Sequence, residues 1–243
     1  MVIKHNNPAD VAQADTLVKA YQEAWRCDRL SAFGGIIGLS RKVDLPTAKS
    51  IVKSGFMECI IAPEYDREAL RLLSEKKNLR ILQLALEDFR VDGYDFKRVQ
   101  GGLLLQEQDL KQVEPQDIKT VTKVKPTKAQ MAAMLFGWKI IKHIKSNAIV
   151  LVKGTKTVGI GCGQTSRVDS ALTAIKKAGK NARSSVMISD AFLPKADNVI
   201  AAAKAGVTAI IQTGGSIADA EVIKAADKAK IAMVTTGIRH FKH

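Results

Sequence analysis

Short, continuously apolar runs alternate along this chain with segments whose apolar residues recur at helical spacing. Runs such as residues 31–39 and 148–152 have the length of strands and few polar positions, which is typical of strands covered on both faces. The segments between them carry helix signals, among them Pro46 in a first turn and Thr127 as a cap. The alternation predicts an α/β fold with a largely parallel sheet.

The same pattern gives the expected elements in order. In the first half we expect strands at residues 1–5, 31–39, 58–62, 79–84 and 101–106. Helices are expected to begin at Pro8 or Asp10, at Leu45 and at Pro63. Residues 85–98 are polar and are expected to be irregular, and residues 107–127 read as a connection. The second half is expected to hold strands at 148–152, 185–189, 208–212 and 231–235, and helices at 128–143, 168–178, 196–205 and 218–228.

A loose repeat relates the two halves. Leu45-Pro46 and Leu193-Pro194 each begin a helix that ends near a glycine (Gly55 and Gly206), and each helix leads to an apolar strand. The repeat predicts two similar lobes, residues 1–115 and 116–243, whose strand-end loops surround a shared cleft. The chance periodicity of α/β chains is the alternative explanation for part of this similarity.

Composition narrows the class of partner. The chain has 38 basic and 24 acidic residues, a net charge of +14, so it attracts polyanions: nucleic acid, phosphorylated metabolites or polyglutamylated cofactors. Many lysines lie on helix faces and there is no RNA-binding aromatic motif, so nucleic acid is the weakest of these readings. No apolar run is long enough to span a membrane and no leader peptide is expected.

The three cysteines are scattered and form no Cys-x-x-Cys pair. This usage favours reduced thiols in a cytoplasmic protein over disulfides or zinc. No pair of histidines has helical ligand spacing, so no metal site is expected.

A glycine-rich stretch at residues 157–167 joins an apolar strand to a helix. Gly159, Gly161 and Gly163 would let the backbone approach a ligand closely, and the helix amino terminus suits an anion. The spacing is not that of a Walker P-loop. A tight strand-to-helix turn without a ligand is an equally supported reading.

Other candidate groups stand at strand ends. His5 could act as a general base, with the neighbouring Lys4 stabilising developing negative charge. Asn147 precedes an apolar strand, where its amide could orient a ligand or only cap a turn. Asp197 lies near a helix start, where it also suits the helix dipole, and Ser216 ends a second glycine turn. The basic tail, residues 239–243, could be a loose end.

A family resemblance becomes specific once these motifs are taken together, because they follow one another in the right order over almost the whole chain. The motifs are Lys4-His5-x-x-Pro8, Ser31-Ala-Phe-Gly-Gly35, Phe56-x-Glu58-x-Ile-Ile-Ala-Pro63, Lys145-Ser-Asn-Ala148, Gly159-Ile-Gly-x-Gly-Gln-x-Ser-Arg167, Ser189-Asp-Ala-Phe192, Gly214-Gly-Ser216 and Arg239-His-Phe-x-His243. The chain resembles the AICAR transformylase domain of the bifunctional enzymes that end purine synthesis.

The resemblance implies a fold of two similar cytidine-deaminase-like α/β/α lobes without a zinc site. It implies formyl transfer from 10-formyltetrahydrofolate, the co-substrate, to the 5-amino group of AICAR, with no metal. His5 resembles the proton acceptor, Lys4 the group that stabilises the transition state, and Asn147 a residue of the reaction centre. The nucleotide-site positions are Gly34, Glu58, Asn147, Arg167, Phe192 and Arg239. The folate-site positions are Val168, Asp197 and, more weakly, Ser216.

The family also implies a homodimer with sites at the subunit interface. The family's cyclohydrolase domain is not found in this sequence, so ring closure to IMP is not expected. The family's upstream Arg-Tyr-Gly segment, which contacts the nucleotide phosphate, is not found either. Asp10 stands where the family usually has glycine, and Lys195-Ala196 replace a Phe-Arg pair. Either a separate polypeptide supplies the upstream segment, or the protein is a non-catalytic purine-nucleotide or folate-binding homologue.

Overall fold

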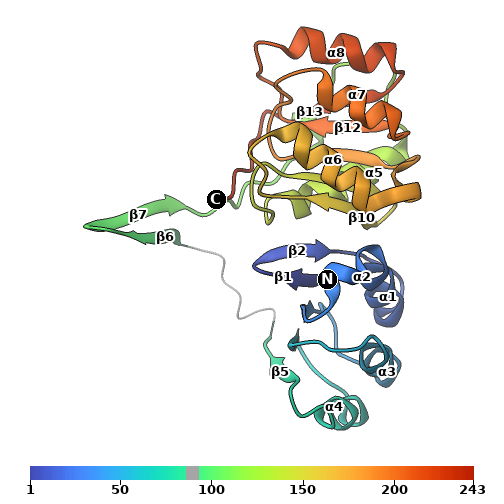
Figure 1. The fold of residues 1–243 in the computed structure, drawn as a ribbon, viewed down its shortest axis with the longest axis vertical. Helices are drawn as coiled ribbons and strands as arrows, with labels where there is room; N and C mark the ends of the chain where they lie inside the picture. Colours follow the sequence, from blue (N-terminus) through green and yellow to red (C-terminus); the bar gives the residue numbers. More distant parts are fainter. Residues whose placement is uncertain (86–92) are drawn as a thin grey trace.

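Two sheets lie along the long axis of the protein in the computed structural model, which describes residues 1–85 and 93–243 (Figure 1). The N-terminal sheet has the strand order β2-β1-β3-β4-β5. Its strands are β1 (Val2–Lys4), β2 (Asn7–Asp10), β3 (Ile36–Gly38), β4 (Cys59–Ala62) and β5 (Arg80–Gln83). The helices of this half are α1 (Leu17–Cys27), α2 (Arg29–Ala32), α3 (Leu45–Lys53) and α4 (Arg67–Ser74).

The C-terminal sheet has the order β10-β9-β11-β12-β13-β8. Its strands are β8 (Lys119–Thr120), β9 (Ile149–Lys153), β10 (Lys156–Gly161), β11 (Val186–Ser189), β12 (Ala209–Gln212) and β13 (Ala232–Thr235). Its helices are α5 (Lys128–Ile141), α6 (Arg167–Ala178), α7 (Asp197–Lys204) and α8 (Asp219–Lys228). Short 3₁₀ turns lie at Pro115–Asp117 and Gly179–Ala182.

Five strands follow the same order and directions in both sheets. A hairpin (β1–β2 or β9–β10) stands at one side, and its first strand is antiparallel to the next strand, β3 or β11. Two further parallel strands complete each set. Right-handed crossover helices connect parallel strands in such units, which is why strands and helices alternate in the sequence as they do.

Helices cover both faces of the C-terminal sheet. One face packs against α5 through residues such as Met134, Trp138 and Ile141, and the other packs against α6, α7 and α8. In the N-terminal sheet, the buried cluster joins one face to α1, α3 and α4, which lie together on one side of the strands (Figure 1). The α/β class expected from the alternation is therefore confirmed.

The two sheets meet through their edge strands. The backbone N of Thr157 in β10 donates to the carbonyl of Val11 (2.9 Å), and Gln13 N donates to Thr155 O (2.8 Å), around an antiparallel bridge between Ala12 and Lys156. The side chain of Lys156 also pairs with Glu23 of α1. Segments far apart in the sequence are thus joined along one seam.

The expected helix start at Pro8 or Asp10 is wrong. Residues Asn7–Asp10 form β2, because His5 and Asn6 both adopt positive φ (50° and 61°) and fold the chain back on β1 in a two-residue hairpin turn. The helix begins at Leu17 after Thr16, whose hydroxyl accepts from Lys19 N (3.4 Å). Proline is tolerated in β2 because this strand is an edge of its sheet.

The single strand expected at residues 31–39 is also wrong in its first half. Asp28 caps the short helix α2, accepting from Ser31 N (3.0 Å), and only Ile36–Gly38 is a strand. The expectation of irregular structure at residues 85–98 is wrong for residues 94–98, which belong to β6 (Tyr94–Val99), while residues 86–92 lie outside the described residues.

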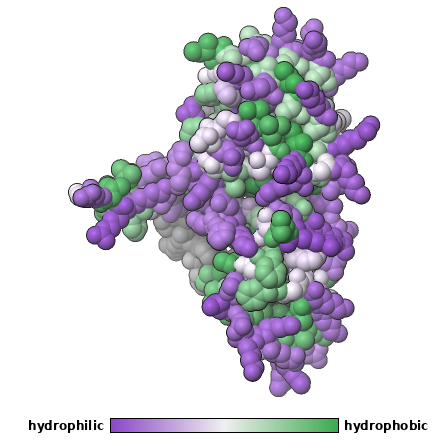
Figure 2. All heavy atoms as spheres, viewed as in Figure 1, coloured by the Kyte–Doolittle hydropathy of each residue, from purple (hydrophilic) through white to green (hydrophobic). Residues whose placement is uncertain are grey.

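β6 pairs with β7 (Gly102–Glu107) in a hairpin that projects from the rest of the protein (Figure 1). Its register places Tyr94, Phe96, Leu103 and Leu105 on one face, where each is between 60% and 67% exposed. Hydrophobic side chains are visible on this arm in the space-filling view (Figure 2). An isolated two-stranded hairpin is marginally stable in water, so an exposed apolar face here calls for a covering partner.

Candidate active site

Lys4 and His5 end β1 and begin the hairpin turn. The Lys4 ammonium donates to the carbonyl of Phe33, and a Cβ placed on Gly34 would lie 3.9 Å from Lys4 Nζ. Gly34 has a φ of +67° and its N–H donates to Phe56 O (3.0 Å), so this loop needs glycine and is tied to the start of β4. Lys4 and Gly34 are therefore neighbours at one edge of the N-terminal sheet.

Glu58 lies beside them at the same edge. Its backbone N donates to Gly35 O (3.1 Å), and its exposed carboxylate pairs with Arg80 (2.7 Å). The pair is solvated, so the carboxylate can exchange Arg80 for another donor at little cost.

The turn that carries Lys4 and His5 is attached to the C-terminal half. Asn7 Oδ1 accepts a hydrogen bond from the backbone N of Lys145 (2.9 Å). Lys145 stands two residues before Asn147, so this contact holds the Lys4-His5 turn beside the loop that precedes β9.

Asn147 is held on both sides of its amide. The amide nitrogen donates to Gln164 O (2.9 Å) and Thr165 O (3.2 Å), and Oδ1 accepts from the Arg167 guanidinium (2.8 Å). The carbonyl of Asn147 accepts from Ser170 Oγ (2.6 Å). Asn147 therefore locks its own loop to the start of α6.

Arg167 is 7% exposed and forms a buried ion pair with Asp190. It also donates to Ser189 Oγ (3.1 Å), and the second Asp190 oxygen accepts from Ser146 Oγ (2.6 Å). The guanidinium charge is thus compensated inside the protein. Its evident role is to hold the loops after β10 and β11 together.

Arg239 is an exposed cation of this region. Its guanidinium lies 5.6 Å from the centre of the Phe192 ring and 5.0 Å from that of Phe241. Stacking on aromatic rings orients the group without using up its N–H donors. An anion can therefore reach it.

The basic tail is not a loose end. His240 N donates to Asp190 O (2.9 Å), and Lys242 O accepts from Ser146 N (2.8 Å). His240 is buried against Trp138 and its Nδ1 lies 2.5 Å from Asp109 Oδ2. These contacts bring Arg239 to the loops that Arg167 holds.

The three residues expected on the folate side lie at the same sheet edge. Val168 is half-buried in the first turn of α6, and Asp197, which begins α7, accepts from the backbone N (2.7 Å) and amide (2.8 Å) of Asn198. Ser216 Oγ accepts from Ala218 N (3.1 Å). The buried Gln212 links the two loops, since its Oε1 accepts from Leu193 N (3.2 Å) and Gly214 N (3.1 Å).

The direction of the strands explains why these groups gather. Because β2 and β10 meet in an antiparallel bridge, the amino ends of β3 and β4 point the same way as the carboxyl ends of β11 and β12. Lys4, Gly34 and Glu58 stand at the first set of ends, and Arg167, Phe192 and Ser216 follow the second. In α/β sheets, ligands bind outside the carboxyl ends of strands, which is where the groups of the C-terminal sheet stand, and Lys4 ends β1 on the same side.

Two of the three glycines in the central turn serve packing. A Cβ on Gly159 or Gly161 would overlap carbonyl oxygens of α6, those of Ala174 and Ser170. Only Gly163 has a positive φ (+66°) with open space around it. The interpretation of a close ligand approach is therefore wrong for Gly159 and Gly161, whose missing side chains let α6 lie on β10.

Sequence reasoning gave Asn7 and Gln212 no role in the site, and it noted Asp190 as a carboxylate on a strand-to-helix loop without assigning it a partner. Asp190 directly follows an apolar strand, which is the signal that marks it. Asn7 gives no comparable signal, because its partner is 138 residues away.

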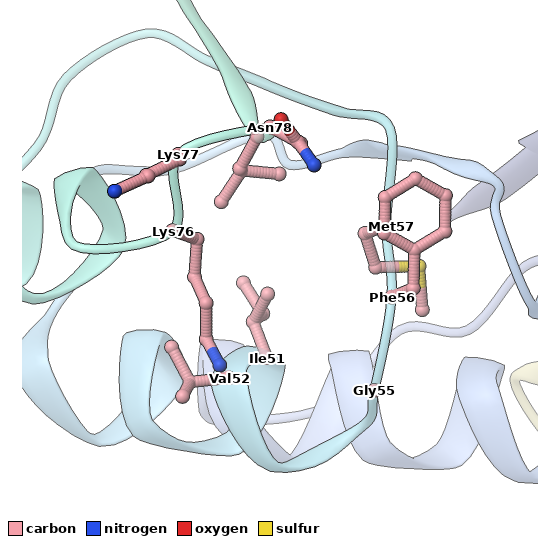
Figure 3. A pocket seen from close by; sticks show the side chains of 9 residues that line it. Ile51, Val52, Gly55, Phe56, Met57, Lys76, Lys77 and Asn78 are labelled. Carbon is pink, nitrogen blue, oxygen red and sulfur yellow. The ribbon is translucent and has the colours of Figure 1, made fainter.

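A separate cavity of about 290 Å³ lies between α3 and the segment after α4 (Figure 3). Ile51, Val52, Phe56 and Leu79 give it apolar walls, with Lys76 at its rim. It touches the site only through Phe56, whose carbonyl holds Gly34.

Over residues 1–85 and 93–243, no three His, Cys, Asp or Glu side chains converge closely enough to bind a metal ion. Within the same residues, every helix is too short or too polar to cross a membrane.

The chain was compared with known proteins. The family model described as "AICARFT/IMPCHase bienzyme" matches residues 1–177. The bifunctional purine biosynthesis protein PurH of Thermoanaerobacter sp. (strain X514) is 51% identical over 243 residues, covering 100% of this chain and 47% of that protein. PurH of Halalkalibacterium halodurans is 50% identical over 243 residues, with the same coverage of both.

PurH of Anaeromyxobacter dehalogenans gives a similar match, 50% identical over 251 residues, covering 100% of this chain and 48% of that protein. The chain thus spans about half the length of the relatives it matches. Among solved structures, Staphylococcus aureus protein SA1388 matches 86% of this chain and 75% of its own, with 11% identity and a TM-score of 0.20. This TM-score is too low to bear on the fold.

The family model and these relatives confirm the resemblance drawn from the motifs: the chain belongs to the AICARFT/IMPCHase bienzyme family.

Proposed function

We propose that the protein transfers the formyl group of 10-formyltetrahydrofolate to the 5-amino group of AICAR, giving FAICAR. Family membership supports the reaction, since relatives named bifunctional purine biosynthesis proteins are about half identical to the chain. The observation that carries the proposal is the Asn7–Lys145 hydrogen bond, because it brings the Lys4-His5 turn beside the loops of Asn147 and Arg239.

In the proposed reaction, the AICAR amine attacks the formyl carbon and forms the new C–N bond. His5 accepts the proton that the amine loses, and Lys4 stabilises the negative charge on the formyl oxygen. The bond between the formyl carbon and folate N10 then breaks, and N10 takes up a proton. Lys4 is already oriented by Phe33 O, and two of its three N–H donors remain for the oxyanion.

The binding roles divide between the two sides of this edge. Arg239, stacked on Phe192, is proposed to hold the nucleotide phosphate, with Gly34 and Glu58 on the nucleotide from the other sheet. Arg167 is proposed to act through Asn147, because its charge is already paired with Asp190. Val168, Asp197 and Ser216 are proposed to line the folate side.

The architecture proposed for this function is a pair of cytidine-deaminase-like lobes, residues 1–115 and 116–243, without a bound metal. The common strand order of the two sheets supports it. A homodimer is proposed as the active form, supported by the exposed apolar face of the β6–β7 hairpin. A cytoplasmic location is proposed from three cysteines that form no disulfide.

A formyl-transfer assay with AICAR and 10-formyltetrahydrofolate tests the proposal. The purified protein is assayed alone and with a polypeptide carrying the part of the Thermoanaerobacter relative outside the match, which includes any separately supplied segment. The variant His5→Asn keeps a residue that tolerates positive φ and should lower the rate about 10²- to 10⁴-fold. Binding of both ligands without turnover under either condition would instead support a non-catalytic homologue.

A further inference from the structure

The cavity between α3 and the segment after α4 lies where both helices end (Figure 3). Gly55 follows the end of α3, and a Cβ added to it would meet no atom within 4 Å. Lys76, Lys77 and Asn78 follow α4 and line the other side. The volume of about 290 Å³ is close to the lower end of the range for ligand pockets, about 300–1,000 Å³. The cavity therefore has room for a small molecule.

The walls of this cavity are held in place by the surrounding backbone. At the end of α3, Ser54 N donates to Ile51 O (3.0 Å), and on the other side Leu79 N donates to Lys76 O (3.0 Å). Ile51 and Met57 are at most 4% exposed, because they belong to the core of the N-terminal sheet. Since these walls are ordered without a ligand, little conformational entropy is lost when one enters.

Apolar side chains form most of the lining. Ile51, Val52, Met57 and Leu79 belong to it, and so does Phe56, whose side chain is 40% exposed. Apolar surface that water can reach is covered favourably by an apolar molecule, and ligand pockets are lined mainly by such side chains. The lining thus fits the apolar part of a ligand.

The charged side chains that line the opening, Lys76 and Lys77, are both cations. Within residues 1–85 and 93–243, neither of them forms an ion pair. Lys53 and Glu75, at the two helix ends, cancel one another in charge. The helix ends themselves contribute about half a negative charge each, which the two lining ammonium groups outweigh. The opening therefore attracts an anion.

Lys76 is the cation placed for an ion pair with a ligand. Its side chain extends along the opening toward Val52, whereas Lys77 points away from the cavity (Figure 3). The amide of Asn78 supplies a neutral hydrogen-bond donor on the same side. An ammonium group and an amide N–H match the two oxygens of one carboxylate.

We propose that this cavity binds a small amphipathic carboxylate, a molecule with one aromatic or branched apolar body and one carboxylate group. The apolar body lies between α3 and Phe56, and the carboxylate meets Lys76 at the opening. The cavity adjoins the candidate active site, because Phe56 O accepts from Gly34 N (3.0 Å) and the Phe56 ring lies 5.9 Å from that of Phe33. The amide of Gly34 should therefore sense a ligand that contacts Phe56.

The test is an NMR titration of the full chain, in which amide chemical shifts give both the location and the affinity of a probe. The probe is 4-phenylbutyrate, and 4-phenylbutanamide, which has the same shape without the charge, is the neutral control probe. Lys76→Glu is the test variant, and Lys49→Glu, at an exposed lysine of α3 outside the lining, is the matched control. Val52→Trp, which fills the cavity, is a second test variant. Each variant is first checked for a wild-type amide spectrum away from the substitution.

We expect 4-phenylbutyrate to shift the amides of residues 51–57, 76–79 and Gly34, with a Kd of about 1 mM or tighter. The neutral probe should bind the wild type more weakly. Lys76→Glu should weaken binding of the carboxylate about fivefold, the scale of an exposed ion pair, and leave binding of the neutral probe unchanged. Lys49→Glu should alter neither affinity, and Val52→Trp should abolish binding of both probes.

The proposal would be overturned by an absence of shifts at the cavity, by equal affinity for the two probes, or by equal losses in Lys76→Glu and Lys49→Glu. Continued binding to Val52→Trp would overturn it too. So would displacement of 4-phenylbutyrate by 10-formyltetrahydrofolate, because the cavity would then be part of the substrate site. Failure of the formyl-transfer assay would not change these outcomes, since the titration measures binding alone.

Discussion

Asn7 Oδ1 accepts a hydrogen bond from the backbone N of Lys145 across the two halves of the chain, at 2.9 Å. The first residue belongs to the hairpin that presents Lys4 and His5, and the second to the loop of Asn147. The relative position of the proposed proton acceptor and the proposed substrate loops therefore depends in part on this side chain, beside the backbone hydrogen bonds of the seam between β2 and β10. This dependence can be tested without touching any reactive group.

Asn7→Ala should lower the kcat of formyl transfer about tenfold or more, because small misplacements of reacting groups are costly. The melting temperature should change little, since the backbone ladder of β1 and β2 remains. Steady-state kinetics and thermal unfolding measure the two effects. Asn181→Ala, at an exposed asparagine of the last 3₁₀ turn, is the control. A wild-type kcat in Asn7→Ala would contradict the role given to this contact.

Removal of the Arg167 side chain should destabilise the fold more than it affects ligand contact. Arg167→Ala leaves the carboxylate of Asp190, which is fully buried, without its cation, and such losses cost about 3–5 kcal/mol. Urea unfolding at pH 7 measures this difference. Arg71→Ala, on the exposed side of α4, should change stability by less than about 0.5 kcal/mol. Similar stability of Arg167→Ala and wild type would show that the ion pair is not needed for folding.

The glycine turn offers a second comparison within a few residues. Gly161→Ala places a methyl group against the Ser170 carbonyl and should cost about 3 kcal/mol, the upper range for overpacking. In Gly163→Ala the added methyl group meets open space. This variant should lose only about 1–2 kcal/mol of unfolding free energy, because alanine disfavours the left-handed backbone. Denaturant unfolding should therefore rank Gly161→Ala as the less stable variant. If Gly163→Ala is the less stable variant, the packing role given to Gly161 is wrong, and Gly161 is again a candidate for ligand contact.

The free energy of unfolding should fall as the pH rises, because the buried carboxyl of Asp10, at the seam between the two sheets, loses its proton. Asp10 is fully buried, and burial raises its pKa to about 7; the nearby Cys27 thiol, Asp28 and Lys177 have smaller effects. In the unfolded chain its pKa is near 4. Between these values the folded state binds more protons, so this contribution to stability is complete below pH 4 and declines toward pH 7, by at most about 1.4 kcal/mol per pH unit.

The comparison of wild type with Asp10→Asn isolates this effect, because the amide stays neutral. Urea midpoints measured from pH 4 to pH 8 should show a steeper decline for the wild type than for the variant. Parallel curves would mean that Asp10 is charged in the folded protein at neutral pH.

The β6–β7 hairpin gives a prediction on assembly. Phe96→Lys with Leu105→Lys places charges on its exposed apolar face and should shift a homodimer toward monomer in light scattering. The pair Leu172→Lys and Ile200→Lys, at residues about half exposed on α6 and α7, is the control. If the hairpin variant has the same molar mass in solution as the wild type, the apolar face of the hairpin is not part of the homodimer interface.

Much of the second half follows from local sequence. Thr127 and Gln130 form the capping box of α5, and the uninterrupted apolar run at residues 148–152 supplies the buried part of β9. The wrong predictions concern segments whose secondary structure depends on contacts with residues distant in the sequence. Asn7–Asp10 is a strand because the His5-Asn6 turn folds it onto β1 and the other half of the chain abuts it, and no local periodicity records either cause.

The candidate site divides in the same way. Strand-end positions singled out Lys4, His5 and Asn147 one by one, but only the family resemblance grouped them with Arg239, which the residue pattern alone left in a loose basic tail. The pairing of Arg167 with Asp190 could not be read from spacing, since it depends on the burial of both side chains. A buried arginine and an exposed one look alike in a sequence.

The seam between β2 and β10 has a consequence for aggregation. Exposed strand edges pair readily with other chains, and each sheet here has hidden one of its two edges against the other. The edges that these two sheets leave open are β5, which carries Arg80, and β8, which has only two residues, one of them Lys119. Short or charged edges resist such pairing. The union of the two sheets therefore protects each half from the intermolecular contacts that either would invite alone.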